Sequence, residues 1–189
     1  MKSEEIAPIL NQQFPEATVK HESKDTWQVD LDRLHLLVVL SEDGSWLRML
    51  VPIASAAEAQ SLLTQLLSDN FDTTQQVRYA LAQGVLWGVF HHRLASLTDE
   101  DFVSAIAILV SLLEKGLSEP FSQVIEQRIR QIIKAAKQQG QSLEATYQTL
   151  DRFYQEGMLG GVDQDPQQRK QFLAAWKYQL ERLWSEVEV

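Results

Sequence analysis

Cysteine is absent from the 189-residue sequence, and glycine (8) and proline (5) are sparse. Without cysteine the chain cannot form disulfides, thiolate metal sites or a cysteine nucleophile, and a reducing compartment is its expected location. No apolar run approaches the roughly 18 residues that a membrane-spanning helix needs. The first residues are acidic and do not resemble a secretory signal. We therefore predict a soluble, cytoplasmic protein.

Positive charge is also scarce, because 17 Lys and Arg residues face 26 Asp and Glu residues and leave a net charge of -9. Nucleic-acid affinity depends on clustered basic side chains, so this balance argues against a nucleic-acid partner. Acidic side chains outnumber basic ones by 16 to 8 in residues 1–117, but only by 10 to 9 in residues 118–189. This change predicts a domain over residues 1–117 and an extension over 118–189.

No catalytic or metal motif is recognisable. His91 and His92 are adjacent, and in a strand they would point to opposite faces, so they could not bind one metal ion. The acidic residues 99–101 fit the positive end of a helix better than a cation site. The glycine-rich segment 157–161 lacks the Gly-Lys-Ser/Thr element of a phosphate loop, and no Gly-x-Ser-x-Gly elbow occurs. We therefore expect no catalytic residue, no bound metal and no cofactor.

Apolar residues alternate with polar ones through much of residues 17–93, which is typical of strands. The expected strands cover residues 17–22, 26–31, 33–41, 45–53, 76–82 and 85–93. Leu31-Asp32, Asp43-Gly44 and Gln83-Gly84 are the expected tight turns, and Asp43-Gly44 suits a two-residue type I′ turn. The pattern predicts an antiparallel meander followed by a separate hairpin.

Apolar residues at helical spacing predict helices over residues 3–13, over residues 56–68, where Leu62, Leu63, Leu66 and Leu67 form the stripe, and from Thr98 to near Gly116. Ser55 and Glu58 form a capping box at the start of the second helix. Residues 118–189 read as three helices, whose first stripe begins at Phe121 and whose last helix begins at Pro166. In that last helix, Phe172, Trp176 and Trp184 are better explained by core packing than by a pigment or lipid site.

The order of these elements over residues 1–117 resembles the type III secretion chaperone-like fold, particularly the YbjN-type bacterial proteins of poorly defined function. The resemblance is carried by the hairpin of residues 34–40 and 46–52, and by the strand of residues 85–90 followed by an acid-capped helix. It implies an α+β fold that is often dimeric, binds other polypeptides and catalyses nothing. We therefore expect an antiparallel sheet flanked by helices, with a C-terminal all-helical extension outside the resemblance.

The expected registers divide the side chains of the sheet between two faces. Three opposed pairs define the core face: Leu40 with Leu47, Val38 with Met49, and Leu36 with Val51. Val77, Tyr79, Leu81, Leu86 and Phe90 are expected on the same face. The opposite face is aromatic, aliphatic and basic, and its candidate protein-binding residues are His35, Leu37, Val39, Trp46, Arg48, Trp87, Val89 and Arg93.

Something should cover this second face, because large exposed apolar patches are uncommon on monomers. The C-terminal helices of the same chain are the favoured cover, and a twin subunit or an acidic, apolar client segment are the alternatives. The predicted function is a non-catalytic polypeptide-binding protein, similar to a chaperone or assembly adaptor, with a homodimer as an option. Two alternatives remain: an enzyme or small-ligand protein with a site between the sheet and the C-terminal helices, and a structural subunit of a larger assembly.

Overall fold

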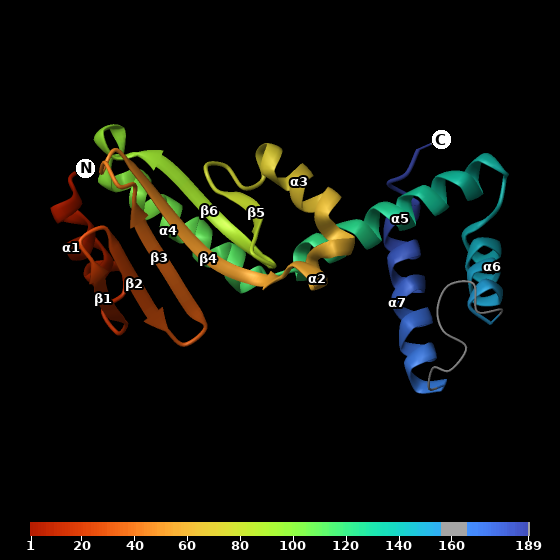
Figure 1. Ribbon diagram of the computed structural model, residues 1–189. Coiled ribbons are helices and arrows are strands. Elements are labelled where there is room, and N and C mark those ends of the chain that lie inside the picture. The colour runs from red at the N-terminus through yellow and green to blue at the C-terminus, as the bar shows by residue number, and fades with distance from the viewer. Residues whose placement is uncertain (156–165, 189) are drawn as a thin grey trace. The chain divides into compact units, whose positions relative to one another are not determined.

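A computed structural model describes residues 1–155 and 166–188 of the chain (Figure 1). It divides into two compact units, which we call unit 1 (Met1–Phe121) and unit 2 (Ser122–Val189). Unit 1 combines a sheet with helices, whereas the described part of unit 2 is helical. Within the described ranges, no helix is long and apolar enough to cross a membrane. The glycine-rich segment 157–161 lies outside the described residues.

Unit 1 is built on a six-stranded antiparallel sheet with the strand order β1-β2-β3-β4-β6-β5. The strands are β1 (Thr18–Ser23), β2 (Thr26–Leu31), β3 (Leu34–Leu40), β4 (Trp46–Ser55), β5 (Arg78–Ala82) and β6 (Val85–Arg93). The predicted meander and hairpin are both present. The hairpin joins the meander through β6, which pairs with β4, so the sheet is continuous. The α+β class predicted from the sequence is confirmed.

The helical segments of unit 1 are α1 (Ser3–Gln13), α2 (Ala56–Ala59), the 3₁₀ turn η1 (Gln60–Leu62), α3 (Leu63–Asp72), the 3₁₀ turn η2 (Leu94–Ser96) and α4 (Asp99–Lys115). The capping box of Ser55 and Glu58 is present at the start of α2. The continuous helix predicted over residues 56–68 is wrong, because Leu62 has φ -108° and ψ 0° and interrupts the α-helical geometry. The predicted stripe also needs correction: Leu62 and Leu66 are buried, but Leu67 is 68% exposed.

The core of unit 1 lies between the sheet and helices α1 and α4 (Figure 1). Leu40 pairs with Leu47 and Val38 pairs with Met49, as predicted, and all four side chains are buried. The sheet and α4 meet closely at Gly88. A Cβ atom at this position would lie 3.1 Å from a methyl carbon of Leu109 and 3.1 Å from one of Val51.

Leu81 departs from the prediction for the core face. Val77, Tyr79, Leu86 and Phe90 are buried there, but Leu81 is 48% exposed. Leu81 lies in β5 at the edge of the sheet, near the tip of its hairpin, so its side chain has neighbours on fewer sides.

The three turns differ in how well the sequence predicted them. Gln83 and Gly84 both have positive φ, 51° and 77°, as a two-residue type I′ turn requires. The turn expected at Leu31-Asp32 is wrong by one residue, because Leu31 pairs with Leu34 and Asp32 takes the positive φ of 47°. This shift moves the pairing by two residues, so every side chain keeps its predicted face.

The Asp43-Gly44 turn has the predicted register but a different geometry. Only Gly44 has positive φ, at 68°, so this is not a type I′ turn. The carboxylate of Asp43 accepts hydrogen bonds from the Ser41 hydroxyl at 2.5 Å and the Ser45 amide at 3.0 Å. The Asp43 side chain thus closes the loop together with main-chain hydrogen bonds from the Gly44 amide to the Ser41 carbonyl and from the Ser41 amide to the Trp46 carbonyl, both at 2.8 Å.

Unit 2 contains α5 (Ser118–Gln138, whose first residues belong to unit 1), α6 (Leu143–Gln155) and α7 (Pro166–Trp184). Its buried cluster consists of Ile129, Ile133, Leu150, Leu180, Leu183 and Val187. Trp176 and Trp184 pack against this cluster, as predicted, whereas the Phe172 side chain lies outside the described residues. Phe121, expected to open the stripe of α5, is exposed because it precedes the helix turns that reach the cluster. Each helix therefore contributes apolar residues to a core within unit 2.

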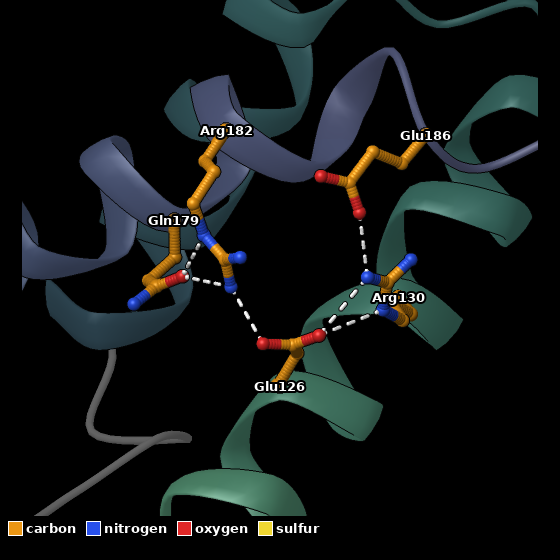
Figure 2. Close-up of polar contacts among 5 residues, drawn as sticks. All are labelled: Glu126, Arg130, Gln179, Arg182 and Glu186. Atoms are coloured by element: carbon orange, nitrogen blue, oxygen red, sulfur yellow. Dashed lines mark hydrogen bonds and ion pairs between the residues drawn. The ribbon is translucent and has the colours of Figure 1, made fainter.

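Polar contacts connect α5 with α7 inside unit 2 (Figure 2). Glu126 accepts hydrogen bonds from Arg182 at 2.6 Å and from Arg130 at 2.9 Å, and Arg130 also donates to Glu186 at 2.6 Å. Hydrogen bonds from Arg182 and then Arg130 lower the pKa of Glu126, whereas Glu186 and then Glu126 raise that of Arg130. These groups are partly exposed, so they fix the orientation of the helices more than they stabilise the unit.

Candidate functional site

The candidate site is the sheet surface of unit 1 that points away from α1 and α4, which we call the outer sheet face. Alternation places one set of side chains there, in contrast to the buried set on the core face. All eight residues predicted from the sequence lie on it: His35, Arg48, Arg93 and Trp46 are exposed, while Leu37, Val39, Trp87 and Val89 are half-buried.

Strand pairing arranges these residues in rows across β3, β4 and β6. Val39 is opposite Arg48, and Arg48 is opposite His91. In the next row, Leu37 is opposite Leu50, and Leu50 is opposite Val89. Because directly opposed side chains lie close enough to touch, each row is a continuous surface. The sheet thus presents an aliphatic row beside a row with a cationic centre.

Trp46 marks one end of this surface. It pairs with Arg93 on β6, and the Cζ atom of Arg93 lies over the indole ring, 5.9 Å from its centroid. The ring of His91 lies 4.8 Å from Trp46, centroid to centroid, at an interplanar angle of 52°. Trp46 is held from two sides yet remains 40% exposed. It can therefore contact a partner without rearrangement.

Trp87 marks the other end of the surface. It is opposite Pro52 on β4, and its indole Nε1 donates a hydrogen bond to the Ala82 carbonyl at 3.1 Å. The β4–β6 register shifts between Pro52 and Ala54, so a β-bulge lies next to this tryptophan. A bulge increases local twist and redirects neighbouring side chains. The hydrogen bond fixes the indole while its ring lines the surface beside Val89.

Two adjoining hollows lie between the tryptophans. The smaller has a volume of about 180 Å³ and is lined by Val39, Leu40, Ser41, Trp46, Arg48, Leu50 and His91. The larger, of about 450 Å³, is lined by Arg48, Leu50, Ala80, Ala82, Gln83, Trp87, Val89 and His91. Arg48, Leu50 and His91 belong to both hollows. The outer sheet face is thus a shallow groove and not a closed pocket.

The positive charges of the outer sheet face are mostly uncompensated. Among the described residues, Arg33, Arg48 and Arg93 form no ion pair with a carboxylate. Asp30 is an acidic residue of this face, and hydrogen bonds from Gln28, then His35, then Lys20 lower its pKa from 3.8 to about 2. Asp30 is therefore already bonded to these neighbours and does not pair with the arginines.

The two adjacent histidines point to opposite faces, as predicted. His91 contacts Trp46 on the outer sheet face, and burial followed by the charge of Arg48 lowers its pKa. His92 stacks on the core residue Phe90, with ring centroids 5.8 Å apart. Both effects favour the neutral form of the His91 ring, which contributes a polar side chain to the groove.

The acidic residues 99–101 belong to a helix cap. The Thr98 hydroxyl accepts a hydrogen bond from the Asp101 amide at 3.0 Å and donates one to the Asp101 carboxylate at 2.7 Å. This is the arrangement expected where acids complement the first turn of a helix. Within residues 1–155 and 166–188, no group of three or more potential ligands could hold a metal ion.

The structure also reveals an exposed apolar surface that the sequence reasoning did not identify. It consists of Leu67 and Phe71 on α3 and Leu81 on β5, and we call it the α3–β5 patch. Phe71 is 90% exposed. Leu67 and Leu81 line a shallow hollow of about 250 Å³ with Leu63, Leu66, Tyr79, Ala80 and Leu86. The spacing of Leu67 and Phe71, four residues apart on one side of a helix, was the available signal.

Comparisons with known proteins found similarity in solved structures alone. No family model matches the sequence, and the search of curated proteins found no match. The solved structures similar to this chain include type III secretion chaperones. The YbjN-type identity inferred from the sequence stays a prediction.

Three of these structures are chaperones in complexes. The ExoU–SpcU heterodimer from the type III secretion system of Pseudomonas aeruginosa has 15% identity and a TM-score of 0.47, covering 60% of this chain and 95% of that chain. The Yersinia pestis chaperone SycH with a fragment of YscM2 has 14% identity and a TM-score of 0.42, covering 59% and 96%. The HopA1–SchA chaperone–effector complex has 12% identity and a TM-score of 0.45, covering 59% and 91%. The partners in these complexes belong to those proteins.

Proposed function

We propose that this chain is a non-catalytic polypeptide-binding protein, similar to a chaperone or assembly adaptor, that holds a protein segment on its outer sheet face. The observation that carries the proposal is the open groove between Trp46 and Trp87, which is lined by aliphatic side chains and by Arg48, an arginine without an ion pair among the described residues. Tryptophan and arginine are the residues most enriched at the energetic centres of protein interfaces. A cytoplasmic location, predicted from the cysteine-free sequence, belongs to the same proposal.

The sequence favoured the C-terminal helices as the cover of the outer sheet face, but the apolar side chains of these helices are buried within unit 2. Ile129, Ile133, Leu180 and Leu183 are buried together inside unit 2. Because these apolar side chains are already buried against one another, they do not require the outer sheet face as a packing partner. This supports a separate protein partner for the groove.

The direct test substitutes aspartate for each tryptophan in the intact chain. A partner is first identified by stoichiometric co-purification, and its binding is then measured with purified components. Trp46→Asp and Trp87→Asp should each weaken binding at least tenfold, since each removes a large apolar contact and adds a charge. Leu31→Asp, at an exposed position outside both hollows, is the matched control and should bind normally.

Circular dichroism and urea unfolding separate binding from folding in these variants. Trp46→Asp should keep the native spectrum, whereas Met49→Asp, which buries a charge on the core face of the same strand, should unfold unit 1. If Trp46→Asp also unfolds the protein, the outer sheet face is interior in the intact chain, and the proposal fails.

We also propose that a second copy of the chain binds at the α3–β5 patch. The exposed residues of α3 from Leu63 to Phe71 are uncharged, and the exposed acid of this helix, Asp72, is its last residue, so two copies would bring few like charges together there. Two outer sheet faces, by contrast, would bring arginines together. By light scattering, the intact chain should have twice the mass of one chain, and Phe71→Lys should return it to one chain mass. Phe121→Lys, at another exposed phenylalanine, should leave the dimer intact.

A further inference from the structure

The two hollows of the outer sheet face share a cationic centre. Arg48 and His91 line both hollows, and each hollow continues beyond them to a tryptophan, Trp46 in one and Trp87 in the other. The remaining shared side chain is aliphatic, Leu50. An occupant that fills both hollows must therefore pass over Arg48.

Arg48 is placed to bind an anion supplied by that occupant. It is exposed, and it forms no ion pair with any described residue. Burial and the charge of Arg48 both lower the pKa of the neighbouring His91 and so disfavour its protonation. A carboxylate beside Arg48 would gain a charge-assisted hydrogen bond in a partly apolar setting, where such bonds are strongest.

The strand geometry sets the spacing of the contacts. Along β4, Trp46 is two residues from Arg48 and six residues from Pro52, the partner of Trp87. At about 3.3 Å per residue, the two tryptophans are about 20 Å apart, which an extended chain spans in about six residues. The anion would then lie about 7 Å from the Trp46 end.

We propose that the bound segment is an extended peptide with an acidic residue between two apolar residues, the acidic residue contacting Arg48 and the apolar residues filling the two hollows. The inference rests on the proposed function, and it adds the chemistry of the segment. A single-stranded nucleic acid could also use arginine and tryptophan. The aliphatic walls formed by Val39, Leu50 and Val89, and the net charge of -9, favour the peptide.

The test uses the intact chain and three labelled synthetic peptides in fluorescence anisotropy. The first peptide has two leucines at this spacing with a glutamate between them, the second has glutamine in place of the glutamate, and the third has the glutamate outside the leucine pair. We expect the first peptide to bind about tenfold more tightly than the other two, since a hydrogen bond to a charged group is lost in both.

Arg48→Gln should abolish this preference by weakening only the first peptide, while Arg33→Gln, at an exposed arginine of the β2–β3 turn outside the hollows, should preserve it. Unchanged thermal unfolding of both variants would show that neither substitution alters binding by destabilising the fold. If the peptides bind in a Trp46-dependent manner without preferring the central glutamate, the inference is overturned and the proposed function stands. If no peptide binds in a Trp46-dependent manner, or if a short oligothymidine displaces the first peptide more effectively than unlabelled peptide does, both are overturned.

Discussion

The side-chain amide of Asn70 hydrogen-bonds with both main-chain groups of Tyr79. Its Oδ1 atom accepts from the Tyr79 amide at 2.7 Å, and its Nδ2 atom donates to the Tyr79 carbonyl at 3.1 Å. Tyr79 lies in β5, the edge strand of the sheet, so α3 provides the hydrogen bonds that a further strand would otherwise supply. A sheet edge whose main-chain groups lack partners invites aggregation, and Asn70 removes two such groups. Pairing of a further strand with β5 at Tyr79 would therefore have to displace Asn70.

Asn70→Ala should lower the free energy of unfolding by about 1–3 kcal/mol, because it leaves two partly buried main-chain groups without partners. Asn70→Asp keeps the acceptor and loses the donor, so it should have a smaller effect. Urea unfolding measures both. Equal stability of Asn70→Ala and the parent chain would show that water replaces the side chain at this edge.

Gly88→Ala should destabilise unit 1 by about 1–3 kcal/mol through overpacking. The added methyl group would lie 3.1 Å from side-chain atoms of both Leu109 and Val51. Gly44 is the matched control, since it has open space around it but a φ of 68°. Gly44→Asn should be tolerated better than Gly44→Ala, because asparagine accepts positive φ more readily. At Gly88 the added volume is the obstacle, so the order should be opposite. Thermal unfolding should show that Gly88→Ala is more stable than Gly88→Asn.

Ile133→Ala should destabilise unit 2 by about 2–5 kcal/mol, because Ile133 is fully buried in the cluster of that unit. The exposed neighbour Lys134 provides a control, and Lys134→Ala should have little effect. Trp176 and Trp184 report on unit 2, while unit 1 contains Trp27, Trp46 and Trp87. For Ile133→Ala, amide hydrogen exchange should become faster in α5, α6 and α7, while exchange in the sheet of unit 1 should not change. Equal loss of protection in both units would mean that they unfold as one.

The Asp43 turn should lose its contribution to stability in acid. Hydrogen bonds from the Ser41 side chain and then the Ser45 amide lower the pKa of Asp43 from 3.8 to about 2. A carboxyl group with a lowered pKa stabilises the fold above its unfolded-state value, and this stabilisation disappears as the pH falls from about 4 to about 2. Carboxyl NMR titration measures the pKa directly. Ser41→Ala should raise it, and an unchanged value would show that the Ser41 contact is not formed in solution.

The sequence predicted those features of the sheet that depend on local pattern. Alternation within β3 and β4 was enough to place Leu47 and Met49 inside and Trp46 and Arg48 outside, because a strand has only two faces. The turns at Gln83 and Asp43 then fixed the registers, even though the conformation at Asp43 was wrong. The residues of the outer sheet face were therefore accessible to sequence reasoning before any contact among them was known.

Features that depend on distant partners could not be predicted in the same way. The pairing of β4 with β6 joins segments separated by α2, η1 and α3, and no local signal specifies it. The interruption at Leu62 likewise has no signal in the local sequence pattern. Leu67 seemed to belong to a core stripe because its neighbours are leucines, but only tertiary packing decides which leucines of a run are buried.

The alternation along β4 makes recognition and stability separable properties of this protein. Trp46, Arg48 and Leu50 face the groove, while Leu47, Met49 and Val51, between and after them, are buried against the helices. Outer residues can therefore be exchanged one at a time for other apolar or charged side chains without disturbing the core. If the outer sheet face binds a segment as proposed, exchanges of its residues would change which segment is accepted while the inner face stays unchanged.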